Sequence, residues 1–240
     1  MTDTAGRRPI RSYVLRQGRM TDAQRRALEQ LWPRYGVALE GETLDPAALS
    51  GRVAPVVLEI GFGNGDALVA AALAHPDWNF LGVEVHRPGV GSLLLKLARE
   101  RIDNVRVVLA DANDVLARLP PASLHGVHIF FPDPWPKKRH HKRRLVQPAF
   151  AARLSDVLAP GGYVHCATDW EDYAAHMLAV LEATPGLVNA AGAGRYAERP
   201  ASRPLTRFER RGAAEGRPAR DLLFRRVPTP DRIEIEQRSS

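Results

Sequence analysis

The sequence contains a single cysteine and no long hydrophobic run. Because Cys166 has no second thiol with which to pair, an intramolecular disulfide is excluded, and a reducing, cytoplasmic compartment is expected. No apolar stretch approaches the roughly 20 residues that a membrane-spanning helix requires, so no membrane association is expected. The N-terminal residues are polar and rich in arginine, which predicts no secretory signal.

Acidic residues are scarce at the N-terminal end of the chain. Eight arginines up to residue 35 stand against three acidic residues, and the whole chain has a formal net charge of +7. This balance favours a polyanionic partner, although charge alone also fits a basic protein that binds no nucleic acid. We expect residues 1–50 to form a basic arm with a short helix that Thr21 and Asp22 cap and Pro33 ends. This helix could lie across the core, but the excess of arginine favours a surface that faces RNA.

Residues 51–240 are expected to form one α/β domain, because short apolar runs alternate there with helical segments. The runs are apolar throughout, which predicts a doubly wound, mostly parallel sheet that is buried on both faces. A last strand near residues 222–224 is expected to be antiparallel, and residues 192–220 to form a mobile loop. The predicted strands are 56–60, 79–85, 105–109, 127–131 and 163–167, and the predicted helices are 66–75, 88–101, 144–158 and 171–183.

A glycine-rich turn follows the first predicted strand and opens the first helix. Gly61, Gly63 and Gly65 let the backbone turn sharply and let a ligand approach closely, since no Cβ intrudes. The third glycine comes too early for the spacing that dinucleotide-binding folds use. Glu59 and Asp66 flank the turn and would repel a pyrophosphate, but they suit a ligand that carries an ammonium and a sulfonium. The turn therefore predicts S-adenosylmethionine as cofactor.

Polar residues end the next two predicted strands. Glu84 comes at the end of the second strand, where a carboxylate can accept hydrogen bonds from both ribose hydroxyls. Asp111 and Asn113 follow the third strand, where they could hydrogen-bond the adenine edge or cap the next helix. The sequence leaves both interpretations of this pair open.

The fourth predicted strand runs into a proline-rich turn that holds one acid and one aromatic residue. Prolines fix φ and remove donors, so the turn pre-organises Asp133 and Trp135 beside the cofactor. The segment resembles the D/N-P-P-Y/F/W motif of amino-group methyltransferases, but it lacks the second consecutive proline. That departure argues against an exocyclic amine as the target.

A dense basic run follows this turn directly. Residues 137–144 carry six fixed positive charges and no acid, which is typical of a surface that binds phosphates. His140 and His141 have no carboxylate or thiol partners at ligand spacing, so no metal is expected. The predicted RNA contacts in this run are Lys137, Lys138, Arg139, Lys142, Arg143 and Arg144.

Two later segments add candidate substrate contacts. Asp169 follows the fifth strand and could accept hydrogen bonds from RNA or cap the next helix. Residues 206–209 then offer stacking, donor and acceptor groups within an arginine-rich stretch, and Phe208 is suited to stacking on a base.

Together these blocks resemble the bacterial tRNA (guanine-N7-)-methyltransferase family, over nearly the whole chain. The similar segments are IRSYVLRQGR at residues 10–19, LEIGFGNG at 58–65, FFPDPW with its basic tail at 130–135, and TRFERRG at 206–212. The resemblance implies a Rossmann-like class I methyltransferase domain over residues 51–240, with tRNA as partner and the variable-loop guanine as target.

The resemblance also implies roles for individual residues. Asp133 would be the catalytic residue and would line the cofactor pocket. The family's last motif usually carries lysine where this chain has Arg207, which keeps the charge but changes its geometry. The implied cofactor contacts are Glu59, Glu84, Asp111 and Asp133, and the implied substrate contacts are Lys137, Asp169, Thr206, Arg207, Phe208 and Glu209.

Three other functions compete with this interpretation. The nearest is a methyltransferase that acts on another nucleic-acid atom, such as an adenine amine. A non-catalytic RNA-binding protein on the same fold is disfavoured, because a pure binder needs neither the intact glycine turn nor the acidic ribose contact at Glu84. A nicotinamide dehydrogenase is disfavoured by the glycine spacing.

Overall fold

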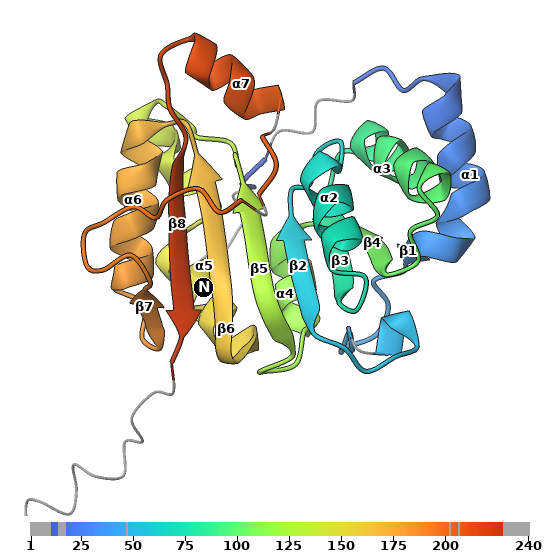
Figure 1. Ribbon diagram of the computed structural model, residues 1–240, viewed down its shortest axis with the longest axis horizontal. Coiled ribbons are helices and arrows are strands. Elements are labelled where there is room, and N and C mark those ends of the chain that lie inside the picture. Colours follow the sequence, from blue (N-terminus) through green and yellow to red (C-terminus); the bar gives the residue numbers. More distant parts are fainter. Residues whose placement is uncertain (1–10, 14–17, 47, 202, 206, 228–240) are drawn as a thin grey trace, which may run out of the picture.

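The computed structural model describes residues 11–13, 18–46, 48–201, 203–205 and 207–227. Over these residues an eight-stranded sheet has the order β1-β4-β3-β2-β5-β6-β8-β7 (Figure 1). β1 to β6 pair in parallel, whereas β8 is antiparallel to both of its neighbours. The strands are β1 (Gly36–Val37), β2 (Val56–Ile60), β3 (Asn79–Glu84), β4 (Val105–Leu109), β5 (Leu124–Phe130), β6 (Leu158–Thr168), β7 (Leu187–Asn189) and β8 (Arg220–Arg226).

Two hydrophobic clusters form the core, one on each face of the sheet. On one face, Leu68 and Leu94 pack with Phe80 of β3, under the helices α1 (Asp22–Tyr35), α2 (Asp66–Ala74) and α3 (Arg87–Arg99). On the other face, Leu58 of β2 packs with Leu154 under α4 (Ala112–Arg118), α5 (Pro148–Val157) and α6 (Glu171–Glu182). The doubly wound class predicted from the apolar runs is thereby confirmed.

The predicted strands are all present, and two of them, β2 and β4, have the predicted bounds. The helix predicted to start at Arg144 begins four residues later, at Pro148, and residues 138–143 form a separate short 3-10 helix, η2 (Lys138–Arg143). The Pro160-Gly161-Gly162 segment follows the end of α5 at Val157. It lies inside β6, where the register against β5 shifts between Leu124 and Gly126.

Much of the predicted arm belongs to the layered fold. Thr21 and Gln24 form a capping box at the start of α1, and the helix continues two residues past Pro33. α1 packs closely on α3, since a Cβ at Gly91 would lie 2.8 Å from Cβ of Gln24. β1 then pairs with β4 at the edge of the sheet. Residues 22–37 are therefore part of the sheet and its helical cover.

The segment from 192 to 220, predicted to be a loop, contains a helix. α7 (Arg207–Ala214) stands above the carboxyl ends of β5 and β6 (Figure 1). The chain before α7 is tied to β8 by a backbone bridge between Ala197 and Asp221. A short 3-10 helix, η1 (Ala48–Ser50), precedes β2. None of the described helices is long and apolar enough to cross a membrane.

Candidate active site

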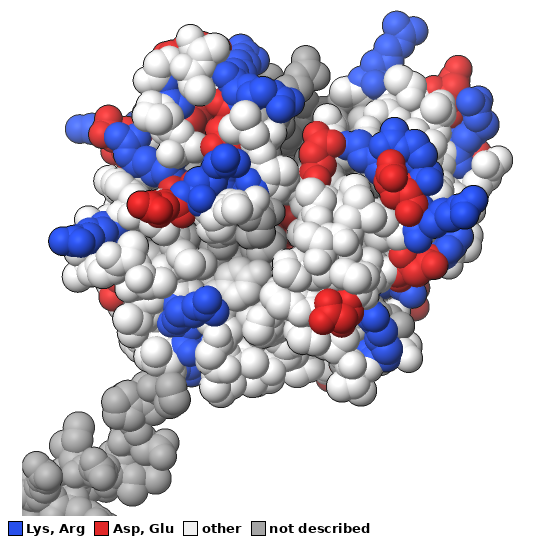
Figure 2. Space-filling view, in the orientation of Figure 1, with Lys and Arg blue, Asp and Glu red and all other residues white. Residues whose placement is uncertain are grey.

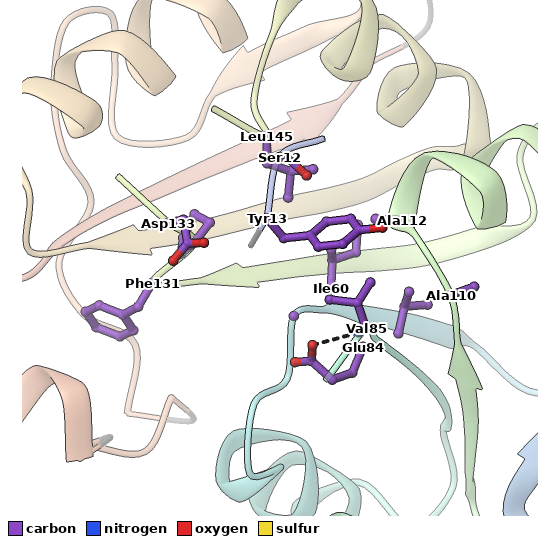
Figure 3. Close-up of a pocket in the computed structure, with 13 residues that line it drawn as sticks. Ser12, Tyr13, Ile60, Glu84, Val85, Ala110, Ala112, Phe131, Asp133 and Leu145 are labelled. Atoms are coloured by element: carbon purple, nitrogen blue, oxygen red, sulfur yellow. Dashed lines mark hydrogen bonds between the residues drawn. The ribbon is translucent and has the colours of Figure 1, made fainter. Parts of the chain in front are cut away.

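The carboxyl ends of β2, β3, β4 and β5 meet at one edge of the sheet, which is where ligands bind in open α/β folds. A cavity of about 190 Å³ opens at this edge. Gly61, Glu84 and Asp133 line it from three different strand ends, together with Tyr13 from the N-terminal segment. Figure 3 shows the Tyr13 ring lying between Asp133 and Ala112. The sheet thus brings together the glycine turn and two of the predicted acids.

The glycine turn leaves open space for a ligand. Gly61, Gly63 and Gly65 have φ angles of 71°, 57° and 79°, which side chains rarely adopt. A Cβ on Gly61 or Gly63 would meet no described atom within 4 Å. A Cβ on Gly65 would instead lie 2.5 Å from Cδ1 of Leu93. The first two glycines therefore keep space free, and the third allows α2 and α3 to pack.

Glu84 is held at the cavity wall by three backbone amides. Its Oε2 accepts a hydrogen bond from the amide of Gly63 at 2.9 Å, and its Oε1 accepts from Val85 and His86 at 2.7 and 2.9 Å. A carboxylate can accept about four hydrogen bonds, so capacity remains for ligand hydroxyls. The side chain thereby ties the glycine turn to the end of β3 and keeps a fixed orientation.

Glu59 is a buried carboxyl with an unsatisfied oxygen. The residue is 2% exposed, and its Oε2 has no hydrogen-bond partner among the described residues. Nδ1 of His128 lies 3.9 Å from this oxygen, too far for a hydrogen bond. Burial raises the pKa of Glu59, and His128 offsets this only in part. Glu59 also lines a cavity of about 400 Å³ beside the glycine turn, with Asn64 and Arg211.

Asp111 has taken one of the two roles that its position allowed. It is the N-cap of α4 and accepts hydrogen bonds from the backbone and side-chain nitrogens of Asn113, at 2.8 and 3.0 Å. Its neighbours Ala110 and Ala112 line the cavity between Glu84 and Asp133, whereas Asp111 and the exposed Asn113 lie beside it. The adenine contact stays a prediction for this pair.

The proline-rich turn is locked from several sides. Phe131 and Trp135 both have positive φ, at 53° and 47°. The indole Nε1 of Trp135 donates to the carbonyl of Ser12 at 2.9 Å, and the Arg143 guanidinium lies 3.8 Å above the indole ring. These contacts fix the turn that presents the exposed Asp133 to the cavity (Figure 3).

Some residues of the basic run are exposed to solvent, and others are bonded to the rest of the protein. Lys137, Lys138, Arg139 and Lys142 are exposed on and beside η2. Arg144 differs from the prediction: it is 2% exposed, donates to the carbonyl of Pro134 at 3.0 Å and pairs with Asp172. A buried, paired guanidinium does not reach RNA phosphates, so Arg144 stabilises the turn instead.

Two of the predicted substrate residues, Asp169 and Glu209, lie at or near α7. Asp169 is half-buried and accepts a hydrogen bond from Nε of Arg217 at 3.1 Å, so it contacts the chain that follows α7. Thr206 lies outside the described residues, and for Arg207 and Phe208 only the helical backbone is described. Glu209 is buried and hydrogen-bonded to Arg203.

Sequence reasoning missed several residues that shape this site. Ser12 and Tyr13 line the cavity, and Arg143 donates to the carbonyls of Arg11 and Tyr13 at 3.1 and 3.2 Å. Burial raises the pKa of Tyr13, and the charge of Asp111 adds to the shift. No short-range motif marks these contacts, because they join segments more than 100 positions apart.

Among the described residues no group of three potential metal ligands occurs.

Comparison with known proteins agrees with this geometry. A family model described as "Putative methyltransferase" matches residues 53–222. A tRNA (guanine-N(7)-)-methyltransferase from Alkalilimnicola ehrlichii is 54% identical, with 94% of this chain and 96% of the relative covered. One from Thiobacillus denitrificans is 56% identical, with 94% and 100% covered. In fold, the chain is similar to the 16S rRNA methyltransferase KamB, with a TM-score of 0.53, 19% identity, and 88% and 96% covered.

Proposed function

Because this chain belongs to the tRNA (guanine-N(7)-)-methyltransferase family, we propose that it methylates the variable-loop guanine of tRNA, with Asp133 as the catalytic residue. The reaction is methyl transfer from S-adenosylmethionine to N7 of a guanine in tRNA. The observation that carries the assignment of Asp133 is its place on the locked turn, at the cavity that Glu84 and the glycine turn also line.

The residues at the sheet edge fit S-adenosylmethionine. The space beside Gly61 and Gly63 accepts a ligand close to the backbone. The unsatisfied, buried oxygen of Glu59 suits an ammonium group, and Glu84 retains acceptor capacity for ribose hydroxyls. We assign these two acids to opposite ends of the cofactor. When bound, S-adenosylmethionine supplies a methyl group that its positively charged sulfur makes electrophilic.

The chemistry of guanine defines what the protein must do. N7 carries an in-plane lone pair and no proton, so no general base is needed. Positive charge develops on the purine as the new bond forms, and the carboxylate of Asp133 would orient the base and stabilise that charge. Positioning supplies the rest, and effective molarity contributes up to roughly 7–11 kcal/mol in ideal cases. The locked turn is suited to this task because it holds Asp133 without reorganisation.

Basic side chains surround the edge at which the cavity opens. Lys137, Lys138, Arg139 and Lys142 are exposed beside the Asp133 turn. Figure 2 shows further lysine and arginine side chains over α7 and near α1 and α3, with acidic side chains among them. Exposed basic side chains attract a phosphate backbone but do not distinguish one base from another. The residues that line the cavity must therefore select the guanine. We also place the enzyme in the cytoplasm, where tRNA is found and where the buried thiol of Cys166 stays reduced.

The target position can be tested with unmodified tRNA transcripts and labelled S-adenosylmethionine. We expect 7-methylguanosine in the nucleoside digest, and we expect it to disappear when the variable-loop guanine is replaced by adenosine. A transcript in which a guanine of another loop is replaced is the control and should be methylated normally. Label that persists after the variable-loop change would move the target elsewhere in tRNA.

Cofactor binding should depend on pH through Glu59. Since burial raises the pKa of Glu59, its carboxyl stays protonated in the free protein above the ordinary carboxyl range of about 4.3. Pairing with an ammonium requires the ionised form, so binding at a pH below the raised pKa releases a proton. Affinity for S-adenosylmethionine is therefore expected to rise with pH from that range through the raised pKa and then to level off.

Calorimetric titration in buffers of different ionisation enthalpy measures this proton release directly. Glu59→Gln keeps the shape of the side chain but cannot ionise, so it should bind more weakly and lose the release. Asp103→Asn, which removes an exposed acid that pairs with Arg34 away from the glycine turn, is the matched control. A release that survives in Glu59→Gln would assign the titration to another group.

A further inference from the structure

One buried arginine joins α7 to the body of the sheet. Arg203 is 2% exposed and uses four of its five N–H donors on two carboxylates. Nε and Nη2 donate to the two oxygens of Asp221 at 2.7 and 2.9 Å. Nη1 and Nη2 donate to the two oxygens of Glu209 at 2.7 and 2.9 Å. The guanidinium thus forms two forked pairs at once, one with β8 and one with α7.

The same guanidinium also reaches the end of β5. It lies 5.7 and 5.8 Å from the ring centres of Phe131 and Phe130, within the range of a cation–π contact. Phe131 directly precedes the turn that carries Asp133. On the far side, Nε2 of His165 in β6 lies 2.7 Å from Oδ1 of Asp221. Arg203 is therefore the point where α7, β8 and the start of the catalytic turn meet.

The energetics of this cluster favour a role in geometry. Burial would lower the pKa of Arg203, but its bonds to Glu209 and Asp221 raise it, so the cation is retained. Burial alone would raise the pKa of Asp221, yet the bonds from His165 and Arg203 lower it. Buried ion pairs often contribute less stability than apolar residues of the same volume. A planar guanidinium that is hydrogen-bonded to two carboxylates, however, fixes the relative orientation of the elements that carry them, which apolar packing does not.

We propose that Arg203 is a positioning residue that fixes α7, and with it the predicted substrate residues 207–209, beside the cavity that the glycine turn lines. Glu209 then acts through Arg203 and does not itself contact the guanine. Arg211, two residues further along α7, lines the cavity beside the glycine turn, so the orientation of α7 shapes that cavity directly. The inference rests on tRNA as the substrate and extends the site to Arg203, which lies outside the recognised motifs.

A double-mutant cycle distinguishes anchoring from direct contact. Arg203→Lys keeps the charge but has three donors on a single nitrogen, so it cannot form two forks. Glu209→Gln keeps the shape but loses one fork. Each single variant should lower kcat/KM for tRNA by about 10- to 100-fold, chiefly through KM, with S-adenosylmethionine affinity changed less. The kcat/KM of the double variant should be no lower than that of the less active single variant, because both changes remove the same anchor.

Effects that multiply in the double variant would show that Glu209 contacts the substrate independently and would overturn the proposal. Arg153→Lys provides the control for stability. Arg153 donates from Nε and Nη2 to the carbonyls of Leu116 and Leu119, at 2.9 and 2.6 Å, and these contacts join α4 and α5 away from the site. If Arg203→Lys loses no more activity than this control after a similar fall in Tm, Arg203 only stabilises the fold.

Hydrogen exchange gives a readout that does not depend on catalysis. Amides of residues 207–214 should exchange faster in Arg203→Lys and in Glu209→Gln than in the wild type, while amides of α2 and α3 should not change. Unchanged protection of α7 in Glu209→Gln would overturn the proposal even if Arg203→Lys failed to fold. If the wild type methylated a guanine outside the variable loop, the target assignment would fail, but the cycle and the exchange data would still test the anchor.

Discussion

Asp133→Ala is expected to lower kcat for tRNA methylation by about 10²–10³-fold, the usual cost of removing one group that stabilises transition-state charge. The reason is that the purine gains positive charge as N7 is methylated, and Asp133 is the acid that the locked turn presents at the cavity. Affinity for S-adenosylmethionine should change only a few-fold, since the glycine turn, Glu59 and Glu84 remain. Single-turnover rates and equilibrium cofactor titration on the same preparation separate the two quantities.

Two companion variants sharpen this result. Asp133→Asn keeps the shape and removes the charge, so it should lose nearly as much rate as the alanine variant if electrostatics dominate. Asp114→Ala removes an exposed acid in the first turn of α4 and should leave kcat unchanged. Losses of rate and cofactor affinity that are equal in Asp133→Ala would make Asp133 a wall of the cofactor pocket and not a catalytic group.

Glu84→Ala is expected to weaken binding of S-adenosylmethionine by about 100-fold, which corresponds to roughly 3 kcal/mol. Two losses add up in this variant. The ribose hydroxyls lose their acceptor, and the amides of Gly63, Val85 and His86 lose the carboxylate that orients the glycine turn. Charge-assisted hydrogen bonds of this kind each contribute about 1.5–3 kcal/mol. A 100-fold loss of affinity therefore requires the loss of only some of the hydrogen bonds that Glu84 accepts.

Glu84→Gln separates the two contributions. The amide oxygen can still accept from backbone donors, so the turn should keep much of its geometry while the affinity falls less than in the alanine variant. Glu100→Ala, at the exposed C-terminal end of α3, is the control for removal of a negative charge. A Glu84→Ala protein that melts earlier but binds the cofactor as tightly as the wild type would restrict Glu84 to a structural role.

The sequence predicted the structure correctly wherever the residues that determine it lie within a few positions of one another. β2 and β4 have the predicted bounds, because an unbroken apolar run specifies a strand buried on both faces. The glycine turn was found for the same reason, since positive φ at Gly61, Gly63 and Gly65 is a property of the residues themselves. The turn at Asp133 was equally visible, as its prolines restrict the backbone without help from the rest of the chain.

Exposure and partners could not be predicted in this way. Within the basic run, Arg144 has the same sequence context as Arg143, yet it is buried against Asp172. Whether a charge in such a run faces solvent or an acid depends on which helix packs nearby. The segment after residue 192 gave a similar result, because its composition predicted a loop while α7 forms above the sheet.

The sequence by itself determined the α/β layering, the glycine turn, the candidate acids at the strand ends and the family resemblance, because each depends on side chains close together in the chain. Tertiary structure alone decided that Ser12 meets Trp135, that α1 covers α3, and that Arg203 binds Glu209 and Asp221 together. The physical reason is that a hydrogen bond or a buried ion pair requires a defined distance and orientation between two groups. When those groups lie far apart in the chain, only the packed sheet and its helices provide that geometry.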